Sequence, residues 1–162
     1  MFLVSILKAG CKFIYFILKA FLSPKNRVTL ITRRQNYTSI DFQILEDRIH
    51  ELHPKHDVVI LNHKQRSPKD HALAVLVEMF YLATSKAVIV DSYIIPVSIL
   101  KHRPGLVIVQ IWHALGAVKK FGHQALDTPE GSTSKIAKLM DMHRGYDFVT
   151  AGSQATQAIF SE

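Results

Sequence analysis

The chain has 162 residues, with 20 Lys and Arg against 13 Asp and Glu, which gives a formal charge of +7. This length fits one domain with a real core, and a hydrophobic content of 48% excludes an intrinsically disordered chain. The charge suits a polyanionic partner such as nucleic acid, anionic lipid or a phosphorylated substrate, although a solvated basic surface has the same composition. Cys11 is the single cysteine, so an internal disulfide is excluded and a cytosolic or cytosol-facing location is expected.

The most hydrophobic segment is the first one, MFLVSILKAGCKFIYFILKAFL. Lys8, Lys12 and Lys19 interrupt it. Three charges disfavour a membrane-spanning helix, and charges placed within the apolar block do not match a secretory signal. On a helical wheel the lysines share one narrow sector, and large apolar side chains cover the rest.

This pattern predicts that residues 1–23 form an amphipathic helix that lies in the membrane interface. The residues expected to bind the membrane are Lys8, Lys12, Lys19, Phe13 and Phe16, with the lysines attracted to anionic headgroups. A helix packed on its own domain or on a partner is one alternative, and a spanning anchor is another. The expected location is peripheral, on the cytoplasmic face of the cell membrane.

Apolar runs and helical patterns alternate along the rest of the chain. Strands are expected at residues 27–32, 57–62, 86–92, 105–112 and 146–153. Helices are expected at residues 38–52, at 67–85, shortly after the fourth strand, at 135–142 and from 153 onward.

Two helix starts carry capping signals. Ser67, Pro68 and Asp70 form a strong one, with a capping serine, a proline in the first turn and an acid three residues after the cap. Thr38 with Asp41 is a weaker capping box for the preceding helix.

Strands without clean alternation, each followed by a helix, predict a parallel sheet covered on both faces. The fold class is therefore α/β and Rossmann-like, with right-handed crossovers, over residues 27–162. No glycine-rich GxGxxG signature occurs, so a nicotinamide cofactor is not supported and no cofactor is expected. The last strand and a newly capped helix come just before the final residue, so we expect this domain to be the first half of a longer protein.

The segment with the strongest candidates for catalytic residues is GLVIVQIWHALGAVKKFG, Gly105 to Gly122. An aliphatic strand leads to Trp112 and His113, and small residues and two adjacent lysines follow. The carboxyl end of a parallel strand is where α/β proteins bind ligands.

This segment resembles the core motif of the CDP-glycerol glycerophosphotransferase family, which includes teichoic acid primases and polymerases. The family pattern is Trp-His-Gly, a spacer, Gly, two residues, Lys-Lys and Gly, and it stands here as Trp112, His113, Ala114, Gly116, Lys119, Lys120 and Gly122. The flanking strings AVIVDSY, KHRPGLVIV and YDFVTAGSQATQAIF support the likeness, which extends from about Arg27 to the end. Ala114 departs from the usual glycine, which would disfavour a left-handed backbone there.

The resemblance implies the N-terminal, acceptor-side half of a two-domain GT-B-like enzyme. Such an enzyme moves glycerol phosphate, or a related polyol phosphate, from a CDP-activated donor to a lipid-linked phosphate acceptor and releases CMP. The donor-binding domain would follow this one, so the fragment alone is expected to be inactive. The expected partners are the CDP-polyol donor, the lipid-linked acceptor and an anionic membrane surface, without nucleic acid.

The motif suggests roles for its residues in phosphoryl transfer. His113 is the candidate general base for the acceptor hydroxyl, because an imidazole titrates near neutral pH. Lys119 and Lys120, with backbone N–H groups around Gly116, are candidates for phosphate binding, although adjacent helical lysines point about 100° apart and only one is expected to reach the phosphate. A structural histidine beside a core tryptophan is the alternative for His113.

Other polar residues follow the first and third strands. Arg33 and Arg34 are candidate phosphate ligands, with plain solvation as the alternative, and Asp91 is a weaker candidate. His50 and His53 are part of a histidine series with a spacing of three, but a proline lies between its members and no cysteine or carboxylate pair completes a shell. No metal site is expected.

Three other functions stay open from the sequence. One is half of a GT-B glycosyltransferase that uses a nucleotide sugar. Another is an inactive, truncated, membrane-associated module. A nucleic-acid binder is the third, but no known module and no interleaving of basic and aromatic residues supports it.

Overall fold

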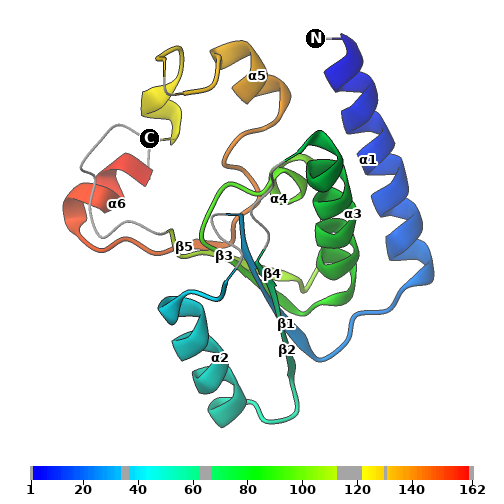
Figure 1. Ribbon diagram of the computed structural model, residues 1–162, viewed down its shortest axis with the longest axis vertical. Helices are drawn as coiled ribbons and strands as arrows, with labels where there is room; N and C mark the ends of the chain where they lie inside the picture. The colour runs from blue at the N-terminus through cyan, green and yellow to red at the C-terminus, as the bar shows by residue number, and fades with distance from the viewer. Residues whose placement is uncertain (1, 34–36, 63–66, 113–121, 130, 161–162) are drawn as a thin grey trace.

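A computed structural model describes residues 2–33, 37–62, 67–112, 122–129 and 131–160. Its centre is a five-stranded sheet in the order β2-β1-β3-β4-β5, and every neighbouring pair is parallel (Figure 1). The strands are β1 (Arg27–Thr32), β2 (Asp57–Asn62), β3 (Ala87–Val90), β4 (Val107–Gln110) and β5 (Phe148–Val149). The predicted α/β class with a parallel sheet is confirmed.

Helices connect the strands and precede the first one. They are α1 (Phe2–Phe21), α2 (Ile40–Leu52), α3 (Pro68–Thr84), α4 (Ile95–Ile99), α5 (Ser134–Leu139) and α6 (Gln154–Phe160), with a 3₁₀ turn η1 (Gly122–Ala125). The short helix α4 fills the segment that the sequence marked only by its turns. The strand expected at residues 146–153 is shorter in the structure, where its ladder includes only Phe148 and Val149.

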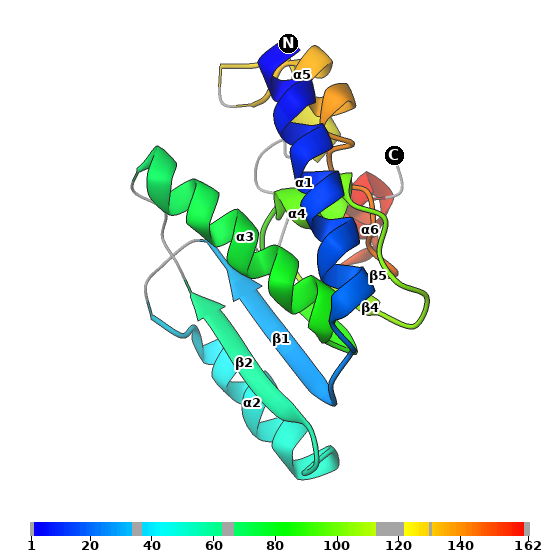
Figure 2. The same ribbon diagram turned by 90° about the vertical axis from the view of Figure 1, so that its right-hand side faces the viewer.

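Both faces of the sheet are covered, because successive strand residues point to opposite sides. In β1, Leu30 packs with Phe42 of α2 on one face, and Ile31 packs with Met79 of α3 on the other. Figures 1 and 2 show α2 on one side of the strands and α3 with α1 on the other. The strands are therefore buried on two sides, which explains their aliphatic runs without polar alternation.

Helix α1 forms an outer layer that packs on α3 and α4 (Figure 2). Tyr15 is its buried residue, and the hydroxyl of Tyr15 donates to His102 Nδ1 at 3.0 Å. The other ring nitrogen of His102, Nε2, donates to the carbonyl of Val97 at 2.8 Å. Arg103 donates to the carbonyls of Lys19 and Leu22 at the end of α1. Among the described residues, no helix combines the length and the hydropathy that crossing a bilayer requires.

The helix caps agree with the sequence in one case and differ in another. Ser67 and Asp70 form the predicted reciprocal capping box of α3. At α2 the cap is Ser39, whose side chain accepts from the N–H of Phe42, and not Thr38 as expected. Thr38 lies one residue too early, and its carbonyl instead accepts from Gln43 at 3.2 Å.

Candidate functional site

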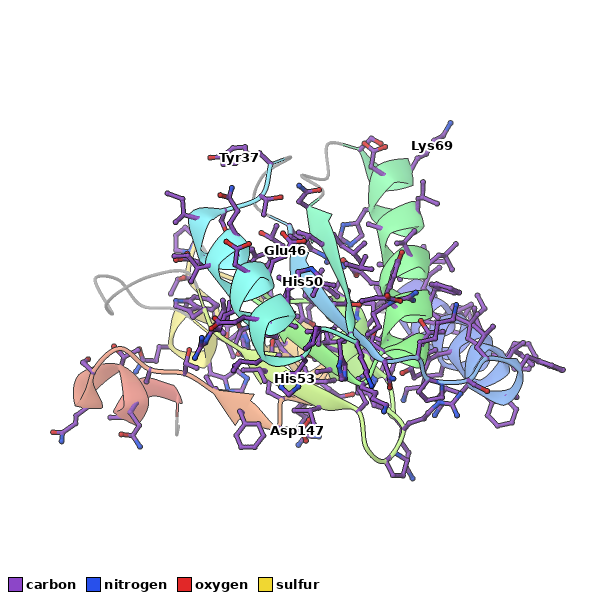
Figure 3. All side chains as sticks on the ribbon, turned by 90° about the horizontal axis from the view of Figure 1, so that it is seen from below. Tyr37, Glu46, His50, His53, Lys69 and Asp147 are labelled. Carbon is purple, nitrogen blue, oxygen red and sulfur yellow. The ribbon has the colours of Figure 1, made fainter. Side chains whose placement is uncertain are left out.

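The strand order defines the expected ligand edge of the sheet. From β1 the chain moves outward to β2 and then returns to the other side of β1 as β3. In sheets of this topology, ligands bind outside the carboxyl ends of the two strands at this reversal, here β1 and β3. In Figure 3, Tyr37 and Lys69 lie toward this carboxyl edge, whereas His53 and Asp147 lie at the opposite end of the strands. The residues that follow β1, β3 and β4 therefore form the candidate site.

A buried glutamine organises the end of β4. Gln110 is only 2% exposed, and its amide nitrogen donates to the carbonyl of Ser92 after β3 at 3.2 Å. Its amide oxygen accepts from the N–H of Trp112 at 2.9 Å. Trp112 has φ of 57°, a left-handed backbone that costs a residue with a Cβ about 1 kcal/mol or more. The hydrogen bond from Trp112 thus helps to hold the backbone in an unfavourable turn directly before His113.

The central motif continues into a segment that the structure does not describe. His113, Gly116, Lys119 and Lys120 lie outside the described residues, and so does Arg34. Their predicted roles remain predictions.

Arg33 lies at the carboxyl end of β1, but its guanidinium is paired inside the protein. Its Nε donates to Glu78 Oε1 at 2.8 Å, and its second donor contacts the other carboxylate oxygen. Side-chain exposure is 12% for Arg33 and 4% for Glu78. The backbone N–H of Arg33 also lies 3.4 Å from the hydroxyl of Ser92. The geometry therefore gives Arg33 a structural ion pair, which neither the phosphate interpretation nor solvation anticipated.

Two further polar residues lie near the same edge. Asp91 directly follows β3 and is 5% exposed. His71, on the first turn of α3, has its pKa lowered by burial and then by the positive charge of Arg33. A neutral imidazole is thus favoured beside the Arg33–Glu78 pair.

A second group of rings lies where the motif ends. His143 is 5.3 Å from Tyr93 and 5.9 Å from His123 between ring centroids. Its ring also lies beside Gly122, the last glycine of the motif, where an added Cβ would be 3.7 Å from Nε2. Burial, followed by the nearby His123, lowers the pKa of His143 to about 4. A neutral imidazole therefore lies next to the end of the motif at pH 7.

The sequence analysis did not select Gln110, Glu78 or His143. Two of them had a signal: Glu78 is the single acid within the apolar run HALAVLVEMFYLATS, and Gln110 is the single amide within VIVQIW. A polar side chain inside a run of buried residues needs a hydrogen-bond partner. His143 had no comparable signal, because it lies in the mixed segment MDMHRGYD and not within an apolar run.

The described residues hold no group of three or more His, Cys, Asp or Glu side chains with metal-binding geometry. His53 and His56 contact each other edge to face at 5.3 Å between centroids. His50 lies on α2, whereas His53 follows its last residue, and Figure 3 shows His53 at the end of the molecule opposite the carboxyl edge.

The membrane-binding residues predicted on α1 have two different environments. Lys8 turns toward the domain, where it donates to Asp141 and to the carbonyl of Leu139, both at 2.6 Å, and its hydrogen bond holds the pKa of Asp141 below its usual value. Lys19 donates to the carbonyl of Lys101 at 2.6 Å. Lys12 stays exposed.

The opposite side of α1 is apolar and exposed. Its large exposed side chains are Phe2, Leu3, Ile6, Leu7, Phe13, Ile14, Phe16, Ile17 and Phe21. Phe13 and Phe16 are 66% and 63% exposed. The helix therefore docks on the domain through Tyr15, with Cys11 and Leu18 packed against the same core, and presents its large apolar side chains outward. Lys8 and Lys19 add hydrogen bonds beside this contact.

The fold and the site define a parallel α/β domain with a ligand edge at the β1/β3 switch point and a strained turn leading into a Trp-His motif. Residues 13–162 match the family of CDP-Glycerol:Poly(glycerophosphate) glycerophosphotransferase. The chain belongs to this family, as its Trp-His and Lys-Lys motif predicted.

Named relatives agree with this assignment. The chain is 28% identical over 166 residues to a teichoic acid ribitol-phosphate primase of Bacillus spizizenii. This alignment covers 99% of the chain and 42% of the relative. It is 32% identical over 109 residues to a teichoic acid glycerol-phosphate primase of the same species, covering 67% of the chain and 27% of the relative. A teichoic acid poly(ribitol-phosphate) polymerase is 33% identical over 92 residues, covering 56% of the chain and 14% of the relative. The chain thus spans less than half the length of these relatives.

Proposed function

We propose that this protein transfers a polyol phosphate, such as glycerol phosphate, from a CDP-activated donor to a lipid-linked phosphate acceptor in the synthesis of teichoic acid or a similar cell-envelope polymer. The observation that carries the proposal is the family match over residues 13–162, which includes the whole Trp-His and Lys-Lys motif. The start of this motif, Trp112, comes two residues after the end of β4 in a parallel sheet, which supports it. The names of the relatives support a polyol phosphate as the transferred group.

In the proposed reaction, an acceptor hydroxyl attacks the phosphorus that bears the polyol. A new P–O bond forms, the P–O bond to CMP breaks, and the proton of the hydroxyl passes to His113. Lys119 or Lys120, with N–H groups around Gly116, would stabilise the negative charge on the phosphoryl oxygens. Gln110 would position His113 indirectly through the backbone of Trp112.

The described chain would be the acceptor-side domain of a GT-B-like enzyme, with most of the donor site in a further domain. The length of the relatives supports this arrangement, since each extends well beyond the matched part. On this proposal, the chain alone shows little or no turnover.

The proposed location is the cytoplasmic face of the cell membrane, as a peripheral protein. Support comes from the exposed apolar side of α1, whose nine large side chains form one face of a helix that is docked on the domain through its other side. Flotation with vesicles, with and without residues 1–22, tests the location. Equal flotation of both forms would overturn it.

A turnover assay tests the reaction. The chain, and the chain extended to the length of its relatives, are incubated with CDP-glycerol or CDP-ribitol and a lipid-phosphate acceptor, and CMP release is followed. We expect the extended form to release CMP and His113→Ala to lower its turnover by about 100- to 10,000-fold, the usual contribution of a general base.

The matched control is His50→Ala, which removes an exposed imidazole from α2 and is expected to keep full activity. Full turnover by His113→Ala would reject the general base. Turnover with a nucleotide sugar in place of both CDP-polyols would reject the proposed donor class, and an extended form inactive with every donor would indicate an inactive module.

A further inference from the structure

A group of cations lies along one side of α1, next to the exposed apolar face. A cavity of about 450 Å³ is lined there by Lys12, Lys19, Lys101 and Arg144, together with Tyr15, Phe16, Ser98, Ile99, Leu100 and Asp141. A neighbouring cavity of about 340 Å³ shares Phe16, Lys19 and Lys101 and adds Arg103. The four basic residues of the first cavity come from α1, from the segment after α4 and from the turn after α5.

The positive charge of this cavity exceeds its negative charge. Asp141 is the one acid among the residues that line it, and this carboxylate already accepts a hydrogen bond from Lys8 at 2.6 Å. Arg144 lies 3.6 Å from the other oxygen of Asp141, with its side chain 77% exposed. Within the described part of the chain, Lys12 and Lys101 form no ion pair.

The cations also act on one another. The pKa of Lys19 is lowered first by partial burial and then by the positive charges of Arg103 and Lys101. Lys19 donates to the carbonyl of Lys101, which fixes its ammonium group near the other cations instead of near an acid. An anion bound at this place would relieve the repulsion among these cations.

The apolar face indicates which anion fits. Phe16 lines the cavity and is 63% exposed, and it belongs to the same helix side as Phe13, which is 66% exposed. On α3, which contacts α1, Leu73 and Leu76 are also exposed. A ligand here would meet a cationic cavity and an apolar surface together, which matches the phosphate headgroup and the acyl region of a lipid.

We propose that Lys12, Lys19, Lys101 and Arg144 form a binding site for the headgroup of an anionic phospholipid, while the apolar side of α1 enters the acyl region of the same bilayer. The inference rests on the membrane location proposed above. It adds a headgroup site in which half of the charges come from two segments distant in sequence from α1, at Lys101 and at Arg144. The lysines of α1 alone would not supply this site, because Lys8 is ion-paired with Asp141 and does not line the cavity.

Vesicle binding tests the site without donor, acceptor or turnover, so a failure of the proposed reaction does not affect the readout. The chain is mixed with vesicles of phosphatidylcholine alone or with phosphatidylglycerol added, and the dissociation constants are measured by sedimentation. We expect tighter binding to the anionic vesicles. Lys12→Gln with Lys101→Gln should weaken that binding by about 25-fold, at about fivefold per cation lost from a membrane surface, and should leave binding to neutral vesicles unchanged.

The matched control is Arg48→Gln with Lys55→Gln, which removes the same charge from exposed positions around α2, on the opposite side of the sheet. This control should change binding to anionic vesicles by less than about threefold, because its charges lie more than a screening length of about 10 Å from the bound surface. An equal loss in both variants would indicate attraction by net charge only and would overturn the headgroup site. Equal affinity of the unaltered chain for neutral and anionic vesicles would also overturn it while leaving the membrane location intact.

Phe13→Ser with Phe21→Ser provides a second test of the surface. These side chains lie outside the cavity and are exposed, so their loss should spare the fold and weaken binding to both kinds of vesicle by tenfold or more. Binding to neither vesicle by the unaltered chain, with self-association in solution instead, would assign the apolar face to a second copy and reject the proposal.

Discussion

At the scale of the residue, Gln110 connects the ends of two strands to the backbone of the motif. Its single amide contacts the carbonyl of Ser92 after β3 and the N–H of Trp112 after β4. Because it is buried, both hydrogen bonds are shielded from water, and losing them leaves two backbone groups without these partners. Trp112 would then lose one restraint on its left-handed conformation.

Replacing Gln110 with methionine keeps the volume of the side chain and removes both hydrogen bonds. We expect turnover of the extended protein to fall by about 10- to 100-fold, because a small displacement of a catalytic group has effects of this size. The measurement is CMP release, with circular dichroism to verify the fold. Gln43→Met, at an exposed position on α2, is the control and should keep full turnover. Unchanged turnover in Gln110→Met would show that this residue does not position the motif.

At the scale of the element, the Arg33–Glu78 pair joins the end of β1 to the middle of α3. Both side chains are nearly buried, and the carboxylate receives two donors from the guanidinium. Removing one partner of a buried pair leaves an uncompensated charge, whereas removing both leaves an apolar contact.

We therefore expect Arg33→Met to lower the free energy of unfolding by about 3 to 5 kcal/mol, measured by urea denaturation. Arg33→Met combined with Glu78→Leu should be less destabilised than Arg33→Met alone. The exposed pair Arg48–Glu51 on α2 provides the control, and Arg48→Gln should cost less than about 1 kcal/mol. If Arg33→Met lowers the free energy of unfolding by less than about 1 kcal/mol, a structural role for the pair is contradicted.

The double variant also tests the phosphate interpretation of Arg33. If it folds and its KM for the CDP-polyol is unchanged, the guanidinium does not bind the donor. A rise in KM with unchanged stability would restore the phosphate role.

At the scale of the whole molecule, several partly buried histidines make folding stability depend on pH. The pKa of His143 falls to about 4, and those of His102 and His71 are also lowered, in each case mainly by burial. The unfolded chain binds these protons near pH 6.5, whereas the folded chain resists them. The contribution of these neutral histidines to the free energy of unfolding is therefore fully present above about pH 6.5, and it is lost as the pH falls from there toward 4.

His143→Asn removes one titrating group and keeps a residue that tolerates the left-handed φ of 62° at this position. We expect the free energy of unfolding to fall less steeply between pH 6.5 and 4 in this variant, by up to about 1.4 kcal/mol per pH unit. Urea denaturation at a series of pH values is the measurement, with His50→Asn as the control for loss of an exposed imidazole. Identical slopes in His143→Asn and the unaltered protein would contradict the burial of a neutral His143.

The sequence by itself determined the fold class and most of the helices and strands, because that information is local. Aliphatic runs without alternation predicted a parallel sheet, Ser67 and Asp70 predicted a helix start, and the Trp-His and Lys-Lys motif predicted the family. The strand order was left open, since it depends on which strand is adjacent to β1 after each crossover. Only the tertiary structure showed that β1 lies between β2 and β3, which locates the ligand edge.

Contacts between distant residues were decided by the tertiary structure alone. The helical wheel placed the lysines of α1 correctly in one sector but did not reveal which way that sector faces. Lys8 pairs with Asp141, 133 positions further along the chain, and Tyr15 is buried in the core of the domain. These contacts show that the large apolar side chains of α1 face outward. Arg33 was assigned to phosphate or water for the same reason, because its partner Glu78 lies 45 positions away. Charge and hydropathy are properties of single residues, whereas the partner of a charge is a property of the fold.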